Sequence, residues 1–262
     1  MRYSIPMFPA AARAAGPYMI ALGVVGIIYG ALIAWRQTDI KKLVAYSSVS
    51  HMGFIVAGMF AFNEQGLSGA LYQMVNHGIS TGALFLLIGV VYERRHTREM
   101  SEYGGLAKVM PWYAFFFVVA TMGSVALPST GGFIGEWLIL FGVFKAHPIM
   151  GSLAGTGVIL GAIYMLWLVL KVVWGPVTNE KNKHLSDVSA REGFILASLC
   201  ALIFVFGLAS QPILAHAQST LLAIKKTVDT NTAYETSLVI GGNAQALPHN
   251  SGARSASRES KK

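Results

Sequence analysis

Long runs of apolar residues, separated by short polar turns, recur along the chain and restrict its fold more than any other feature. Crossing the hydrocarbon core of a bilayer takes about 20 apolar residues in a helix. Six segments reach or approach that length, at approximately residues 17–35, 43–62, 67–92, 111–144, 149–174 and 194–214. Helices that are apolar on every face suit lipid better than the surface of a soluble domain. We therefore predict an all-α integral membrane protein with about six transmembrane helices.

Charged residues are scarce and lie mostly between these segments. They make up 12% of the 262 residues, about half the share in ordinary soluble domains. The net charge of +8 does not indicate a nucleic-acid partner, because the basic residues lie in short loops and a polar tail. We predict a non-membrane lead-in at 1–15, a transmembrane domain at 16–215 and a polar, disordered tail at 216–262.

Lysine and arginine are concentrated in alternate loops. The loops after the second and fourth segments contain only Lys145. The loops after the first, third and fifth contain Arg36, Lys41, Lys42, Arg94, Arg95, Arg98, Lys108, Lys181 and Lys183. The positive-inside rule places this second group in the cytoplasm or its equivalent, and both termini on the opposite side. We interpret these charges as topology signals.

The fourth segment is too long for one straight helix. Its 34 residues would span about 50 Å, against a hydrocarbon core of about 30 Å. The sequence LPSTGGF at residues 127–133 places a proline and two glycines near its middle. Proline removes a backbone donor and glycine weakens a helix, so we predict a discontinuous helix here. Transporters place ion sites at such interruptions.

Three titratable residues inside the apolar segments are the candidate site. Glu136 follows the predicted interruption, and His51 and His77 lie within the second and third segments. A carboxylate at membrane depth costs several kcal/mol unless it is neutralised or paired, and a histidine can relay protons near neutral pH. We therefore predict proton transfer through Glu136, His51 and His77. The alternative is that Glu136 only ends or caps a helix at the membrane surface.

Other polar residues in these segments allow two interpretations. In the first, they hold the water of a proton relay, and in the second, they hydrogen-bond the helices to one another. The residues are Tyr46, Ser47, Ser48, Ser50, Asn76, Ser80 and Thr81. Cys200 is the single cysteine, so the chain offers no multi-cysteine metal site. Without a CxxC, Walker or dinucleotide-binding motif, we expect no cofactor and no metal to be bound by this chain.

Four sequence motifs, in order, resemble the antiporter-like subunits of respiratory complex I, the proton-translocating NADH:quinone oxidoreductase. They are TDIKKLVAYSSVSHMG at 38–53, QMVNHG at 73–78, YERRHTR at 92–98 and LPSTGGFIGE at 127–136. The last three favour subunit M, also called chain 4. The resemblance covers roughly residues 1–215 and implies the second inverted repeat and the last helix of that fold. It matches Glu136 to the broken-helix glutamate of the proton exit path, and His51 and His77 to histidines of the central polar axis.

The resemblance also implies partners and a location. Other membrane subunits of complex I would surround the chain in a bacterial or organellar inner membrane, and the whole complex would use NADH and quinone. The family's first repeat, with its buried glutamate and lysines, has no counterpart, so this sequence corresponds to the C-terminal portion. A truncated gene model, a split gene and a degraded copy would each explain this partial match equally well. Two alternative functions remain open: a subunit of a multi-subunit Na⁺/H⁺ antiporter or membrane-bound hydrogenase, and a non-conducting structural fragment.

Overall fold

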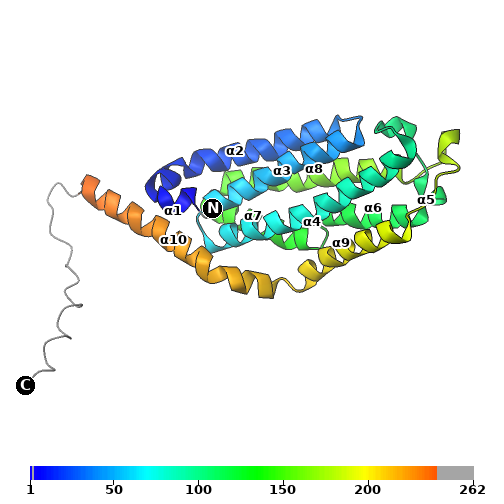
Figure 1. Cartoon of the computed structure of the whole chain (residues 1–262). Coiled ribbons are helices and arrows are strands. Elements are labelled where there is room, and N and C mark those ends of the chain that lie inside the picture. Colours follow the sequence, from blue (N-terminus) through cyan, green and yellow to red (C-terminus); the bar gives the residue numbers. More distant parts are fainter. Residues whose placement is uncertain (2, 241–262) are drawn as a thin grey trace, which may run out of the picture.

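The structure, a computed structural model, describes residues 1 and 3–240 as an elongated helical bundle with α1 at one end and α5 at the other (Figure 1). Extended strands are absent from this described part, which confirms the predicted fold class. The elements are α1 (Ser4–Met7), α2 (Pro9–Trp35), α3 (Ile40–Phe60), α4 (Glu64–Arg95), η1 (Met100–Glu102), α5 (Leu106–Val109), α6 (Pro111–Ser124), α7 (Gly131–Ala146), α8 (Pro148–Val172), η2 (Glu180–Asn182), α9 (Ala190–Leu208) and α10 (Gln211–Ile240).

Five of these helices, α2, α3, α4, α8 and α9, are long and apolar enough to cross a membrane. Helices α6 and α7 have 14 and 16 residues, and at about 21 and 24 Å neither would cross alone. Together they occupy the predicted fourth segment and are separated at residues 125–130. The discontinuous fourth span is therefore confirmed.

The interruption between α6 and α7 is a tight turn. Ala126 and Ser129 have left-handed backbone conformations, with φ of 60° and 81°, which non-glycine residues rarely adopt. The Thr130 hydroxyl donates to the Leu127 carbonyl at 2.7 Å. Helix α9 packs directly on this turn, because a Cβ at Gly207 would overlap the backbone of Ser129. The turn is thus held by protein on one side.

Glycines allow the spanning helices to approach closely. On α4, a Cβ at Gly69 would lie 2.6 Å from the Ile139 nitrogen of α7. On α2, a Cβ at Gly23 would lie 2.8 Å from the Gly53 carbonyl of α3. Small residues at such contacts bring backbones together, which is how helices associate in lipid. Helix α7 is thereby pressed against α4.

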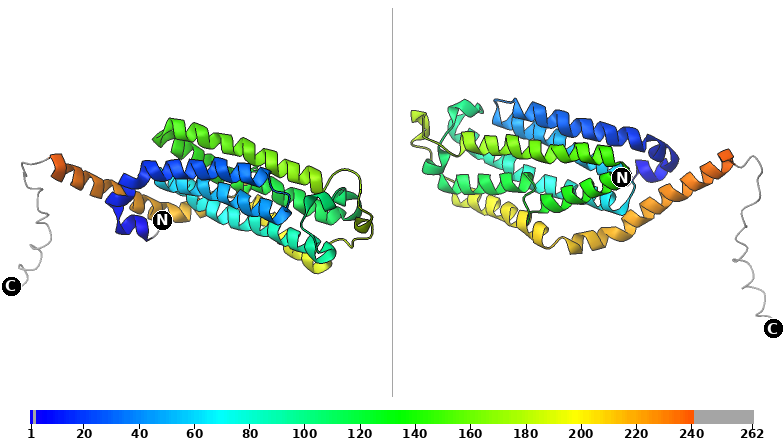
Figure 2. Two further views of the ribbon diagram at one scale, coloured as in Figure 1. Left: turned by 90° about the horizontal axis from the view of Figure 1, so that it is seen from above. Right: turned by 180° about the vertical axis from the view of Figure 1, so that it is seen from behind.

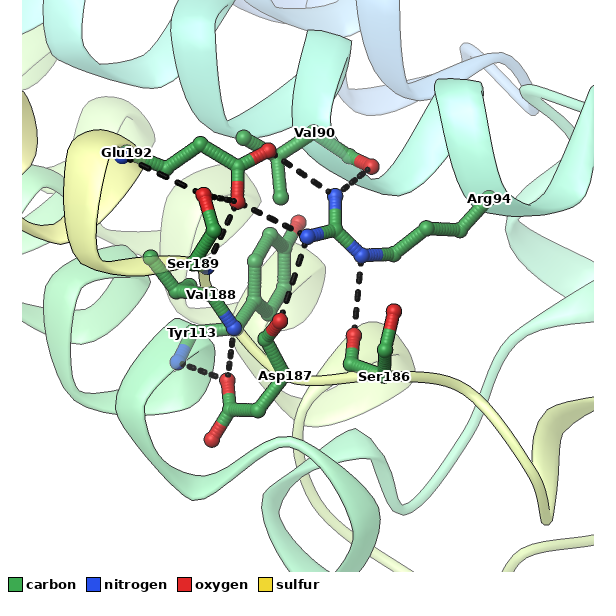
Figure 3. Close-up of polar contacts among 8 residues, drawn as sticks. All are labelled: Val90, Arg94, Tyr113, Ser186, Asp187, Val188, Ser189 and Glu192. Atoms are coloured by element: carbon green, nitrogen blue, oxygen red, sulfur yellow. Dashed lines mark hydrogen bonds and ion pairs between the residues drawn. The ribbon is translucent and has the colours of Figure 1, made fainter.

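A polar cluster fastens the α5 end of the bundle (Figure 3). Arg94, near the end of α4, makes two hydrogen bonds to the Glu192 carboxylate of α9, at 2.8 and 3.1 Å. It also donates to the carbonyls of Ser186 and Asp187, at 2.8 and 3.1 Å. A guanidinium that binds a carboxylate with two parallel bonds is both strong and directional. Arg94 therefore joins α4 to α9, a role that the topology interpretation did not include.

The same cluster caps the first half of the discontinuous span. The Asp187 carboxylate accepts hydrogen bonds from the backbone N–H groups of Trp112 and Tyr113, at 2.9 and 3.0 Å. N–H groups in the first turn of a helix have no acceptor within the helix, and a negative charge is favoured there. The cluster thus fixes the start of α6, at the opposite end of this 14-residue helix from the α6–α7 turn.

The helices at the two ends of the predicted transmembrane domain begin and end at other residues than its bounds. Helix α2 begins at Pro9 rather than near residue 16, because residues 10–15 are five alanines and one arginine, all strong helix formers. Helix α9 ends at Leu208 rather than near residue 214. Pro212 lies in the first turn of the next helix, where its missing donor costs nothing.

The predicted disordered tail at 216–262 needs correction for its first half. Residues 216–240 belong to α10, which bends away from α9 and passes the end of the bundle where α1 lies (Figure 2). Leu221, Ile224 and Val228 recur at helical spacing, and the last two pack with Ile5 and Phe62 in an apolar cluster. This stripe outweighs the polar composition on which the prediction depended. Residues 241–262 lie outside the described part.

The glycine packing gives a matched test on one helix. Gly69→Ala should destabilise the fold by about 1–3 kcal/mol, because its Cβ would push into α7. Gly82→Ala, also on α4, should be neutral or stabilising by up to about 1 kcal/mol, since a Cβ there meets nothing within 4 Å. Thermal unfolding of both variants in one detergent measures the difference. Equal stabilities would contradict the close α4–α7 contact.

Candidate functional site

Glu136 lies in the interior of the bundle, in the second turn of α7. It is 4% exposed, and the helix begins five residues earlier at Gly131. The residue at the N-cap position is Thr130, whose side chain forms no capping bond. Glu136 therefore neither caps nor ends a helix, which removes the interpretation of a surface carboxylate.

Two side chains from other helices bind the same oxygen of Glu136. His51 Nδ1 lies 3.0 Å from Oε1, and Gln73 Nε2 donates to Oε1 at 3.1 Å. Both hydrogen bonds of the carboxyl group among the described residues go to Oε1, and neither involves the second oxygen, Oε2. One oxygen is therefore held in place, while the other is free to carry a proton.

His51 connects this carboxylate to the interrupted helix. It is 6% exposed and lies near the midpoint of the 21-residue helix α3, about 15 Å from either helix end. Its second ring nitrogen, Nε2, lies 3.4 Å from the hydroxyl of Ser124, the last residue of α6. Four helices, α3, α4, α6 and α7, thus meet at one cluster, at a depth of about half the hydrocarbon core.

His77 lies beside His51 but does not contact Glu136. The two imidazole centroids are 5.1 Å apart, and His77 Nδ1 lies 3.1 Å from the Thr81 hydroxyl. Gln73, His77 and Thr81 are spaced four residues apart, so they form one polar stripe along α4. The structure therefore brings all three predicted residues together, with His51 in the centre.

The glycines of the motif LPSTGGFIGE let α7 reach α4. A Cβ at Gly131 would overlap the amide of Asn76, and one at Gly135 would overlap the side chain of Gln73. Side chains at these two positions would move α7 away from α4. Without that approach, Glu136 could not reach Gln73 at hydrogen-bonding distance.

Most of the other polar residues in these segments bond to the backbone. The hydroxyls of Ser47 and Ser48 donate to the Val44 carbonyl, and Ser50 donates to the Ile27 carbonyl of α2. Ser80 donates to the Asn76 carbonyl. Only Ser50 joins two helices in this way, whereas Ser47, Ser48 and Ser80 bond within their own helices. Thr81 alone among these residues binds a histidine.

The electrostatics of the cluster depend on the His51–Glu136 pair. It is the one ion pair with both partners below 10% side-chain exposure in the described part of the chain. An isolated charge there would cost several kcal/mol, so the two groups are stable only as a pair. The pair is neutral overall whether the proton resides on the imidazole or on the carboxyl group. The arrangement can therefore move a proton between two atoms without changing the net charge of the interior.

Gln73 and Ser124 are members of this cluster that the sequence reasoning did not assign. Gln73 lies four residues before His77 on α4, and that spacing is a signal for a shared polar face. Ser124 carries no comparable signal, because only the position of the α6–α7 turn brings it to His51.

Comparisons with known proteins agree with this architecture. Residues 1–163 match the family described as NADH:quinone oxidoreductase/Mrp antiporter, TM. NADH-quinone oxidoreductase subunit M of Rhodobacter capsulatus is 47% identical over 207 residues, which are 79% of this chain and 40% of that protein. Subunit M of Rickettsia prowazekii is 46% identical over 214 residues, 82% of this chain and 44% of that protein.

A solved structure is similar over most of the fold. A chain of respiratory complex I from Thermus thermophilus with bound NADH superposes with a TM-score of 0.81 at 32% identity. The match covers 87% of this chain and 48% of the Thermus chain. The chain spans about two fifths of the length of the curated relatives it matches.

A double-mutant cycle tests the central contact of the site. We expect His51→Gln and Glu136→Gln to be non-additive by about 1–2 kcal/mol in unfolding free energy, because each removes the partner of the other. The control cycle pairs Glu136→Gln with Ser48→Ala, whose hydroxyl bonds only its own helix. That control should be additive within about 0.5 kcal/mol. Additivity in both cycles would contradict a direct His51–Glu136 interaction.

Proposed function

The chain belongs to the NADH:quinone oxidoreductase/Mrp antiporter transmembrane family, and from that premise we propose that it is the part of subunit M that forms the exit half of a proton path. In this proposal the membrane subunit acts within a proton-translocating NADH:quinone oxidoreductase. The observation that carries it is the contact of 3.0 Å between His51 Nδ1 and Glu136 Oε1 in the buried centre of the bundle. The names of the curated relatives support the assignment to subunit M.

His51 acts as the relay of this path. An imidazole can take up a proton at one nitrogen and release one from the other. Here Nδ1 faces Glu136, and Nε2 faces Ser124. A proton that reaches Nε2 converts the ring to an imidazolium, and the proton on Nδ1 then passes along the hydrogen bond to Oε1. Glu136 is then a carboxylic acid, and rotation of its carboxyl group turns this proton away from His51, where it is released. The imidazole keeps the proton on Nε2 and returns to its starting tautomer by turning over.

His77 supplies the proton to His51 in the proposed sequence. Its ring centroid is 5.1 Å from that of His51, and no hydrogen bond joins the two rings, so a bridging water must complete the step. Its partial exposure and its bond to Thr81 suit a residue at the mouth of the path. Gln73 is a positioning residue, because it holds Oε1 and leaves Oε2 free.

In this proposal, electron transfer takes place in other subunits. The chain itself binds no cofactor, and the complete complex uses NADH and quinone. Other membrane subunits of the complex surround it. The curated relatives come from bacteria, which supports a location in the bacterial inner membrane.

The same family includes Mrp antiporters, so sodium/proton exchange is the second candidate. The buried pair would serve either process, because both need a carboxyl group that gains and loses a proton. Replacing sodium by choline separates them: proton movement by the oxidoreductase should persist, whereas exchange should stop.

Glu136→Gln in the assembled complex should lower proton translocation about tenfold or more, because the amide keeps the shape of the side chain but cannot carry a proton. The measurement is acidification of membrane vesicles driven by NADH, normalised to quinone reduction. The control is Glu180→Gln, in the exposed loop before α9. An intact complex that pumps normally with Glu136→Gln would support the structural-fragment alternative instead.

A further inference from the structure

A polar cavity lies at the end of the bundle opposite α5. It has a volume of about 530 Å³ and lies between the start of α2, the end of α3, the α7–α8 junction and α10. In Figure 1 this is the end where α1 and α10 come together. Arg13, Lys145 and Lys225 contribute the positive charges of its wall, and Asp229 contributes the negative charge. Its volume falls within the range of about 300–1,000 Å³ of small-molecule sites.

The cations of this cavity outnumber the acidic groups. The Asp229 carboxylate lies 2.7 Å from Lys225 Nζ and 3.8 Å from the guanidinium of Arg13. Lys145 forms no ion pair with any described residue, and its ammonium lies over the ring of Phe141 instead. Three positive charges therefore face one negative charge. In the predicted topology this end of the bundle is the side on which the positive-inside rule disfavours lysine and arginine. Their convergence on one cavity therefore indicates a negatively charged binding partner.

An apolar groove begins beside the same lysine. It has a volume of about 200 Å³ between α7 and α8, and its wall includes Trp137, Phe141 and Phe144, with Gly155 opposite. These aromatic residues recur at spacings of three and four, so they form one face of α7. Lys145 Nζ lies 4.4 Å from the centroid of Phe141. Lys145 therefore lines the polar cavity and at the same time contacts an aromatic residue of the groove wall.

We propose that the cavity and the groove together bind one anionic phospholipid. The phosphate of the headgroup pairs with Arg13, Lys145 and Lys225, and one acyl chain lies in the groove along Trp137, Phe141 and Phe144. Clustered lysine and arginine bind phosphate through charge-assisted hydrogen bonds and attract anionic lipid headgroups. A zwitterionic lipid would bring its own cation into a cavity that already has an excess of two. This proposal does not depend on proton transfer through Glu136.

The binding test uses the purified chain in detergent and short-chain phosphatidylglycerol, phosphatidylcholine and inorganic phosphate as three separate probes. Native mass spectrometry measures the bound fraction. We expect phosphatidylglycerol to bind, and its affinity to fall about fivefold for each cation removed. Arg13→Gln combined with Lys145→Gln should therefore weaken binding about 25-fold. Lys41→Gln, at the opposite end of the bundle, is the control and should leave binding unchanged.

A second variant tests the groove without changing any charge. A Cβ at Gly155 meets nothing within 4 Å, so Gly155→Leu should fold normally and fill the groove. It should reduce phosphatidylglycerol binding about tenfold or more. Unchanged lipid binding in both the double variant and Gly155→Leu would overturn the proposal. Inorganic phosphate that binds as tightly as phosphatidylglycerol, or phosphatidylcholine that does so, would also overturn it, because the site would then recognise a free anion or any lipid.

Discussion

The structure depends on one buried contact, the pair formed by His51 and Glu136. The Glu136 carboxyl group is buried by protein beside the middle of α3, where an unpaired charge would cost several kcal/mol. The imidazole removes that cost and at the same time offers a second site for the proton. Stability and proposed function therefore rest on the same 3.0 Å contact.

The rest of the bundle explains how two residues 85 positions apart in the sequence come into contact. The interruption at residues 125–130 divides one span into α6 and α7, and α7 then packs against α4 through glycines at both sides of the interface. At the far end, Arg94, Asp187 and Glu192 fasten α4, α6 and α9 together. The first half of the span is thus anchored at its start, and its last residue, Ser124, meets His51.

The sequence predicts the helices better than it predicts the contacts between them. The length of each apolar run and the proline–glycine motif are local properties of the sequence, so the six spans and the interruption follow from them directly. The role of Ser124 depends on the path of the turn after it. Helix α10 depends on an apolar stripe that packs against Ile5 near the N-terminus and against Phe62 after α3. Gln73 lies between these cases, because its spacing from His77 is visible in the sequence while its partner is not.

Infrared difference spectroscopy tests the central claim most directly, since the carbonyl stretch of a protonated carboxylic acid is distinct from that of a carboxylate. Spectra of the purified chain in lipid are recorded as the pH is changed, for the natural sequence and for Glu136→Gln. We expect a carboxylic acid band that changes with pH, disappears in Glu136→Gln and moves in His51→Gln. Identical difference spectra for the natural sequence and for Glu136→Gln would show that Glu136 does not exchange a proton, and would contradict the account.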